Sequence, residues 1–200
     1  KDLAEEYFDD GSKVVFFAEF YAKNETWLFD ASVVSEDMLT VILHQQFPKL
    51  SFAQTYFGYL GAPVSDILKN EVLRVWGDDV LLTYEQLSER LPYIPLERIK
   101  FTLGQNSEFI WNSVNTYSHI SRINITDEEQ QTIRKAAMQE CNTRGYVSIM
   151  NLPLGEIVER NYKLSVTAVH NAIFSICLSG KYDKKGKIIT RRGNVIDALS

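Results

Sequence analysis

The sequence predicts a mainly helical chain with small β-hairpins, arranged as consecutive modules of similar design. Apolar residues recur at helical spacing through most of the chain, and short β-prone segments in pairs follow some of the helices. The order of these elements repeats with a period of roughly 60 to 65 residues. The composition is that of a folded chain, because 45% of the 200 residues are hydrophobic and 12% are aromatic.

The second module, residues 63–124, shows the pattern most clearly. Its predicted elements are a helix from Val64-Ser65-Asp66 to Gly77, a helix headed by a capping box of Thr83 and Gln86, a helix from Pro95 with Leu96, Ile99 and Leu103 buried, and strands at residues 108–111 and 116–120. Residues 112–115 form the predicted turn between these strands.

The third module, residues 125–200, repeats this order. Its predicted elements are a helix capped at Thr126 and closed by Gly145, an extended stretch at residues 146–149, a helix over about 154–162, a helix capped by Ser165, and strands at 181–183 and 187–190 across a Lys184-Lys185-Gly186 turn. Helix, strand, helix, turn, helix and hairpin is the order of a winged helix-turn-helix, in which the hairpin is the wing. A module of this size has a thin core, so tandem stacking is physically reasonable.

The first module, residues 1–62, is less regular. An apolar run covers residues 14–21, and Ser35 caps a helix that carries Met38, Leu39, Ile42 and Leu43. Pro48 and Ser51 are expected to introduce another helix with Phe52, Tyr56, Phe57 and Leu60. This gives a helix-turn-helix without an obvious wing. Two interpretations stay open: a degenerate module, or a helical cap on the other two.

Residues 71–120 resemble the HARE-type winged helix-turn-helix family, which includes the N-terminal domain of the delta subunit of bacterial RNA polymerase. The resemblance rests on Glu71-Val72-Leu73, on Leu82-Thr83-Tyr84-Glu85-Gln86-Leu87, and on the wing from Glu108-Phe109-Ile110-Trp111 to Thr116-Tyr117. Residues 127–192 are similar to a second, more divergent copy. The chain lacks the acidic tail of the delta subunit. The resemblance implies tandem winged-helix modules, and by analogy a role in transcription regulation.

Charge is distributed unevenly along the chain. The formal net charge is −5, which is unusual for a general nucleic-acid binder. Residues 181–192, however, contain six cations and one acid, so the rest of the chain is strongly acidic. The sequence therefore predicts an acidic body with one basic tip.

The third module contains most of the candidate nucleic-acid contacts. In a winged helix that reads DNA, the third helix enters the major groove and the wing touches the backbone or the minor groove. The outward residues of that helix are expected to be Thr167, His170 and Asn171, none of which is charged at neutral pH. Attraction to phosphate would come from the wing cations Lys181, Lys184, Lys185, Lys187, Arg191 and Arg192. The alternative is a solvated hairpin whose charges only maintain solubility.

The second module offers weaker candidates. Arg98 and Lys100 lie on its third helix and are offset by Glu97. Trp111 lies on the predicted wing. An exposed Trp111 would suit a protein partner or another module, but we expect it to pack on its own core.

No enzyme, metal or cofactor signature is recognised. The three histidines are far apart in the sequence and none lies at ligand spacing from a cysteine. Cys141 and Cys177 are expected to be reduced core thiols of a cytoplasmic protein, with a disulfide as the alternative. No apolar run approaches the roughly 18 residues of a membrane span. The start of the chain lacks an apolar signal-peptide segment and an initiator Met, so we expect a fragment or a processed form of something longer.

Two functions follow as hypotheses. The first is a non-enzymatic region that binds double-stranded DNA through the third module. The second is a protein-interaction scaffold that uses the exposed aromatic side chains. The oligomeric state is not predicted.

Overall fold

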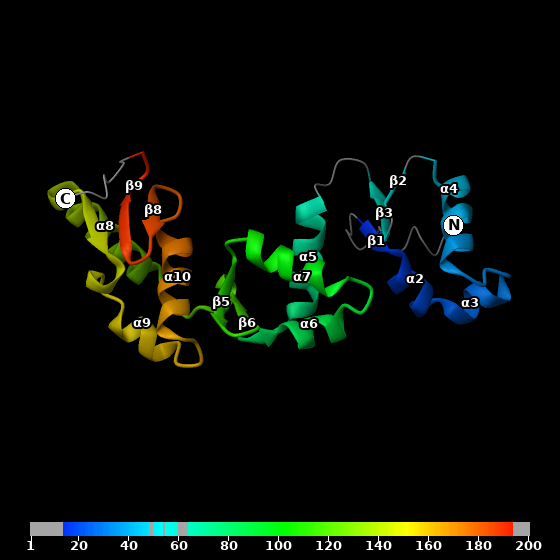
Figure 1. Cartoon of the computed structure of the whole chain (residues 1–200), viewed down its shortest axis with the longest axis horizontal. Helices are drawn as coiled ribbons and strands as arrows, with labels where there is room; N and C mark the ends of the chain where they lie inside the picture. Colours follow the sequence, from blue (N-terminus) through cyan, green and yellow to red (C-terminus); the bar gives the residue numbers. More distant parts are fainter. Residues whose placement is uncertain (1–13, 49, 54, 60–63, 194–200) are drawn as a thin grey trace. The chain divides into compact units, whose positions relative to one another are not determined.

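A computed structural model describes residues 14–48, 50–53, 55–59 and 64–193 (Figure 1). Within them the chain is mainly α-helical with small β elements, as the sequence predicts. The β elements form antiparallel sheets of three strands each, one strand more than the predicted hairpins. None of the described helices combines the length and the apolar character needed to cross a membrane.

The chain divides into two compact units. Unit 1 contains Lys1–Val75 and Ser88–Thr102, and unit 2 contains Trp76–Leu87 and Leu103–Ser200. The division runs through the elements of the module expected at residues 63–124. Each unit is therefore described by itself.

Unit 1 begins with a small sheet covered by helices. Its first described elements are β1 (Val14–Phe16), α2 (Phe17–Lys23), α3 (Glu25–Asp30), α4 (Glu36–Gln46), β2 (Leu50–Phe52) and β3 (Tyr56–Tyr59). The predicted cap of α4 is confirmed, because the Ser35 hydroxyl accepts a hydrogen bond from the Met38 amide at 3.2 Å. The core of this part contains Val15, Phe17, Phe20, Leu28, Val33, Leu39, Leu43 and Phe57.

The prediction of a helix after Pro48 is wrong. Residues 50–52 and 56–59 are instead strands of a hairpin, and β3 pairs antiparallel with both β1 and β2. The spacing of Phe52, Tyr56 and Phe57 fits a helix, but a short apolar run fits a strand equally well. Pairing with β1, about 40 residues earlier in the chain, decides between the two, and this first module does have a hairpin. Leu60 lies outside the described residues.

A polar cluster joins separate segments of unit 1. Glu71 and Arg74 lie on α5 (Val64–Trp76), and Arg74 Nη2 donates to Glu71 Oε1 at 2.6 Å and to Glu19 Oε1 at 3.2 Å. Tyr93 precedes α7 (Leu96–Gln105), and its hydroxyl also donates to Glu71. Burial, followed by the contact with Glu71, raises the pKa of Tyr93. These bonds satisfy the buried Glu71 carboxylate and connect α2, α5 and the segment before α7.

The first part of unit 2 is a short sheet beside a capped helix. Its strands are β4 (Leu82–Thr83), β5 (Phe109–Ser113) and β6 (Thr116–His119), and the helix is α6 (Tyr84–Arg90), which begins in this unit. The predicted capping box is confirmed: the Thr83 amide donates to Gln86 Oε1 at 2.9 Å, and the Gln86 amide donates to Thr83 Oγ1 at 3.2 Å. The predicted turn is shorter than expected, because β5 continues through Asn112 and Ser113.

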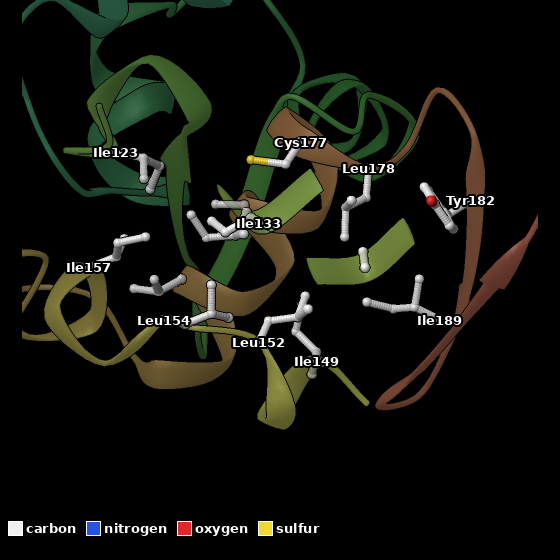
Figure 2. Packing of buried hydrophobic residues seen from close by; sticks show 14 of the residues in the cluster. Ile123, Ile133, Ile149, Leu152, Leu154, Ile157, Cys177, Leu178, Tyr182 and Ile189 are labelled. Carbon is white, nitrogen blue, oxygen red and sulfur yellow. The ribbon is translucent and has the colours of Figure 1, made fainter. Parts of the chain in front are cut away.

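The second part of unit 2 has the elements predicted for the third module. These are α8 (Asp127–Arg144), β7 (Tyr146–Ser148), α9 (Gly155–Arg160), α10 (Val166–Cys177), β8 (Tyr182–Lys185) and β9 (Ile188–Arg191). The capping box of Thr126 and Glu129, the cap by Ser165, and the left-handed Gly145 that ends α8 are all confirmed. Figure 2 shows part of the core, which includes Ile133, Ile157 and Ile189.

The same sheet topology occurs in all three sets of described elements. The strand orders are β1-β3-β2, β4-β6-β5 and β7-β9-β8, so each first strand pairs with the last strand of the hairpin that follows it. Each hairpin is thereby attached to the helices that precede it in sequence.

Asn161, which follows α9, is a buried polar residue with several partners. Its Nδ2 donates to the carbonyl oxygens of Asn124 (3.0 Å) and Ile157 (2.8 Å), and its Oδ1 accepts from the Asn124 amide at 2.9 Å. We expect Asn161→Ala to lower the free energy of unfolding by about 1–3 kcal/mol, because it removes the partners of part-buried backbone groups. Urea unfolding and amide exchange at Asn124 measure this effect. Asn151→Ala, at an exposed position, is the control, and equal stabilities of the two variants would contradict the prediction.

Candidate nucleic-acid interface

The last hairpin of unit 2, strands β8 and β9, which we call the wing, carries the predicted basic residues, but its turn lies later than the sequence indicates. Lys184 and Lys185 end strand β8, and the chain reverses at Gly186 (φ +61°) and Lys187. Lys184 pairs with Ile189 and Lys185 with Ile188. Because adjacent side chains of a strand point to opposite faces, Lys184 and Lys185 lie on different faces of the wing.

The cations near the turn form a first group, the tip group, which contains Lys184, Lys185 and Lys187. Lys185 and Lys187 are exposed, whereas Lys184 is half-buried and its Nζ donates to Asn171 Oδ1 on α10 at 2.6 Å. Asn171 is a predicted contact with bases, but its side-chain oxygen Oδ1 already accepts a hydrogen bond within the protein.

His170 lies near the same cations. Burial lowers the pKa of its imidazole, and the charges of Lys184 and Lys187 lower it further. His170 is therefore neutral at pH 7. It adds hydrogen-bonding capacity to this surface but no charge.

The other wing cations form a second group, the base group, which contains Lys181, Arg191 and Arg192. Arg191 donates to Asn142 of α8, and Arg192 donates to Asp183 Oδ1 at 3.4 Å and to the Ser179 carbonyl at 2.8 Å. Together with Arg134 and Lys135 of α8 these residues line a hollow of about 670 Å³. The single basic tip expected from the sequence is thus divided between the turn and the base of the wing.

Arg134 and Lys135 were not among the predicted site residues. In the sequence they are two cations of a helix rich in charged and polar residues, where solvated charges are ordinary. Only the packing of α8 beside the base of the wing brings them near Lys181, Arg191 and Arg192.

The helix α10 packs against β5 as well as against its own core. At its N-terminus the Ser165 amide donates to Asn112 Oδ1 at 2.7 Å, and the Ser165 hydroxyl donates to the Asn112 carbonyl at 3.0 Å. Farther along, Asn171 and Phe174 line a small hollow with residues of β5. Thr167 is exposed, as expected, whereas His170 and Asn171 are only half-exposed. The face of α10 that would enter a DNA groove is therefore partly covered.

The exposure of Trp111 differs from the prediction that it packs on its own core. Its side chain is 49% exposed and lines the hollow beside α10, so it does not pack into a core of its own. Phe109 and Ile110, which precede it on β5, are both buried, and exposure begins at Trp111, nearer the turn of the hairpin.

Arg98 and Lys100 belong to unit 1, whereas the wing belongs to unit 2. Lys100 Nζ contacts Glu97 Oε1 at 2.9 Å, and Arg98 is an exposed residue beside a hollow near Tyr93. The exposed ion pair of Lys100 reduces the net charge available to a ligand there.

The described residues were also compared with what a cysteine nucleophile or a metal site requires. Cys141 and Cys177 are free and buried, as predicted. Burial raises the pKa of the Cys177 thiol to about 11, so it is not an activated nucleophile. Among the described residues, no three His, Cys, Asp or Glu side chains are grouped so as to hold a metal ion.

In comparisons with known proteins, no family model matched the sequence, and no curated protein matched it. The resemblance to HARE-type modules therefore stays a prediction.

We expect Asn112→Ala to loosen the start of α10. The Ser165 amide would lose its acceptor, at a cost of about 1 kcal/mol. Hydrogen–deuterium exchange of the amides at residues 165–168 should then become faster. Ser113→Ala, at an exposed position on the same strand, is the control, and unchanged exchange in Asn112→Ala would show that this contact does not hold α10.

The stability of unit 2 should depend on the protonation of His170. Because its pKa is lower in the folded than in the unfolded state, the unfolded chain binds the proton more tightly. Stability should therefore fall as the pH drops below about 6.5, the ordinary pKa of histidine, and stay level above it. Urea midpoints between pH 7.5 and pH 5.5 measure this, with an NMR titration of His170. His170→Gln should reduce the change, and an unaltered pH profile would contradict the assignment.

Proposed function

We propose that the chain is a non-enzymatic region of tandem winged-helix modules that binds double-stranded DNA and serves in transcription regulation. The repeated sheet topology, with a hairpin after each set of helices, supports the modular part of this proposal. The observation that carries the DNA-binding part is the concentration of six cations and one acid on and beside the last hairpin, in an otherwise acidic chain.

The phosphate backbone is the expected target. Lysine and arginine contacts to phosphate supply affinity that does not depend on sequence and that decreases with salt. Lys185 and Lys187 are exposed near the turn of the wing, and in this proposal they make such contacts. The helix α10 contains no Lys or Arg, so it adds little electrostatic attraction.

Base readout is limited in this proposal. Thr167 is the exposed polar residue of α10 among the predicted contacts, His170 is half-buried, and the Asn171 side chain is held by Lys184. The contribution of α10 is therefore a few polar contacts, and weak sequence preference is expected.

Charge reversal of the tip group tests the proposal. With Lys185→Glu and Lys187→Glu combined, we expect the affinity for duplex DNA to fall at least about tenfold at low salt, because two cations near phosphate are replaced by acids. The slope of log K against log salt should become shallower by about 2. Fluorescence anisotropy of a labelled duplex at roughly 50–200 mM salt measures both quantities.

Lys135→Glu, on α8, is the control for this experiment, since it changes the net charge of the same unit without altering the wing turn. If the wild-type chain binds no duplex at low salt, or if the control weakens binding as much as the wing variant, the proposal is wrong.

A protein-interaction scaffold is the second candidate function. The packing of α10 against β5 favours it, because a partly covered helix is poorly suited to groove insertion. An acidic chain also repels DNA over much of its surface. A stoichiometric protein partner that stays bound after nuclease treatment, in a chain that binds no duplex, would favour this candidate.

A further inference from the structure

The hollow at the base of the wing, which we call the basal hollow, has a chemistry different from that of the wing tip. It lies between α8, the C-terminal end of α10 and the start and end of the wing. Its lining residues are Arg134, Lys135, Met138, Ile176, Cys177, Leu178, Gly180, Lys181, Tyr182, Arg191 and Arg192. Its volume of about 670 Å³ is within the range of roughly 300–1,000 Å³ that is usual for binding pockets.

The floor of the basal hollow is apolar. Met138 is the main accessible part of it, with 48% of its surface exposed, and Ile176 is partly buried beside it. Methionine adapts its shape to different apolar groups. This floor can therefore accept a bulky apolar side chain without rearrangement of the core.

The rim of the basal hollow is cationic, and several of its side chains are held in place. Arg134 Nε donates to the Cys177 carbonyl at 3.2 Å, and Arg192 Nη2 donates to the Ser179 carbonyl. A guanidinium group has five N–H donors, so each arginine keeps further donors for a ligand. Such preorganisation lowers the entropy lost on binding.

The charge of the basal hollow selects an anionic partner. Its lining contains five cations and no acid, and the neighbouring Asp183 is engaged by Arg192 at 3.4 Å. A duplex backbone would satisfy the cations but has no apolar side chain for the floor. An acidic peptide with a bulky apolar residue satisfies both.

We propose that the basal hollow binds an acidic peptide segment of a partner protein, in which carboxylates flank a leucine or phenylalanine side chain. The carboxylates pair with the arginines and lysines of the rim, and the apolar side chain packs on Met138 and Ile176. This interaction is additional to DNA binding and does not depend on the tip group.

Fluorescence anisotropy on the full chain tests the proposal. The probe is a labelled short peptide that alternates Glu with Leu and Phe. Two matched peptides replace every Glu by Gln, or every Leu and Phe by Ser. Both replacements should weaken binding at least about tenfold, since each removes one of the two kinds of contact.

Met138→Gln separates an apolar floor from simple charge attraction. It preserves length, charge and helix propensity at an exposed position. We expect it to weaken the acidic peptide at least about fivefold and to leave duplex DNA binding unchanged. Lys135→Glu should also weaken the peptide, whereas the combined Lys185→Glu and Lys187→Glu variant should have a much smaller effect. Equal thermal unfolding of Met138→Gln and wild type shows that the variant is folded.

Three results would overturn the proposal. The first is that the Gln-substituted peptide binds as well as the acidic one. The second is that Met138→Gln leaves peptide binding unchanged. The third is that Met138→Gln weakens the binding of duplex DNA and of the peptide equally. The last result would make the basal hollow part of a DNA surface. Failure of the DNA-binding proposal is detected separately, because it is tested by the wing variant and a duplex probe.

Discussion

The helix α10 is buried on two sides, and this packing decides which surfaces of unit 2 can bind a ligand. One side supplies Ala168, Val169, Ala172 and Ile173, each with 0% exposure, to the core. The other side meets β5, where Asn112 binds both the backbone and the hydroxyl of Ser165. A helix fixed in this way cannot reorient to fill a groove without breaking these contacts. Because α10 contains no Lys or Arg, the basic groups that flank it come from the wing and from α8.

The wing cations lie in two different environments, one at the turn of the hairpin and one at its base. A two-stranded hairpin is long enough for its turn and its base to have different neighbours. At the turn, Lys184 lies against Asn171 of α10, whereas at the base Arg191 contacts Asn142 of α8. The tip group is mainly polar and exposed, which suits phosphate. The base group borders an apolar floor, which suits a ligand with both charged and apolar parts.

Two buried polar side chains, one in each unit, are held by several hydrogen bonds. In unit 1 the Glu71 carboxylate is bound by Arg74 and Tyr93. In unit 2 Asn161 satisfies both backbone groups of Asn124. Each of these residues connects segments that are distant in sequence. Small modules have thin apolar cores, and such polar contacts add specificity to the way their segments meet.

The sequence by itself determined the local structure of much of the chain. The capping boxes at Thr83 and Thr126, the Ser165 cap and the Gly145 terminus depend on neighbouring residues alone, and the helices they begin or end were predicted correctly. The basic character of the last hairpin was also evident from composition. The tertiary structure decided the rest, because it depended on contacts between distant segments. Strand pairing with β1 made residues 50–52 and 56–59 a hairpin, the packing of β5 beside α10 left Asn171 only half-exposed, and the position of α8 brought Arg134 and Lys135 to the wing. Periodicity and spacing report only on neighbours along the chain, so neither could reveal which helix face a distant strand covers.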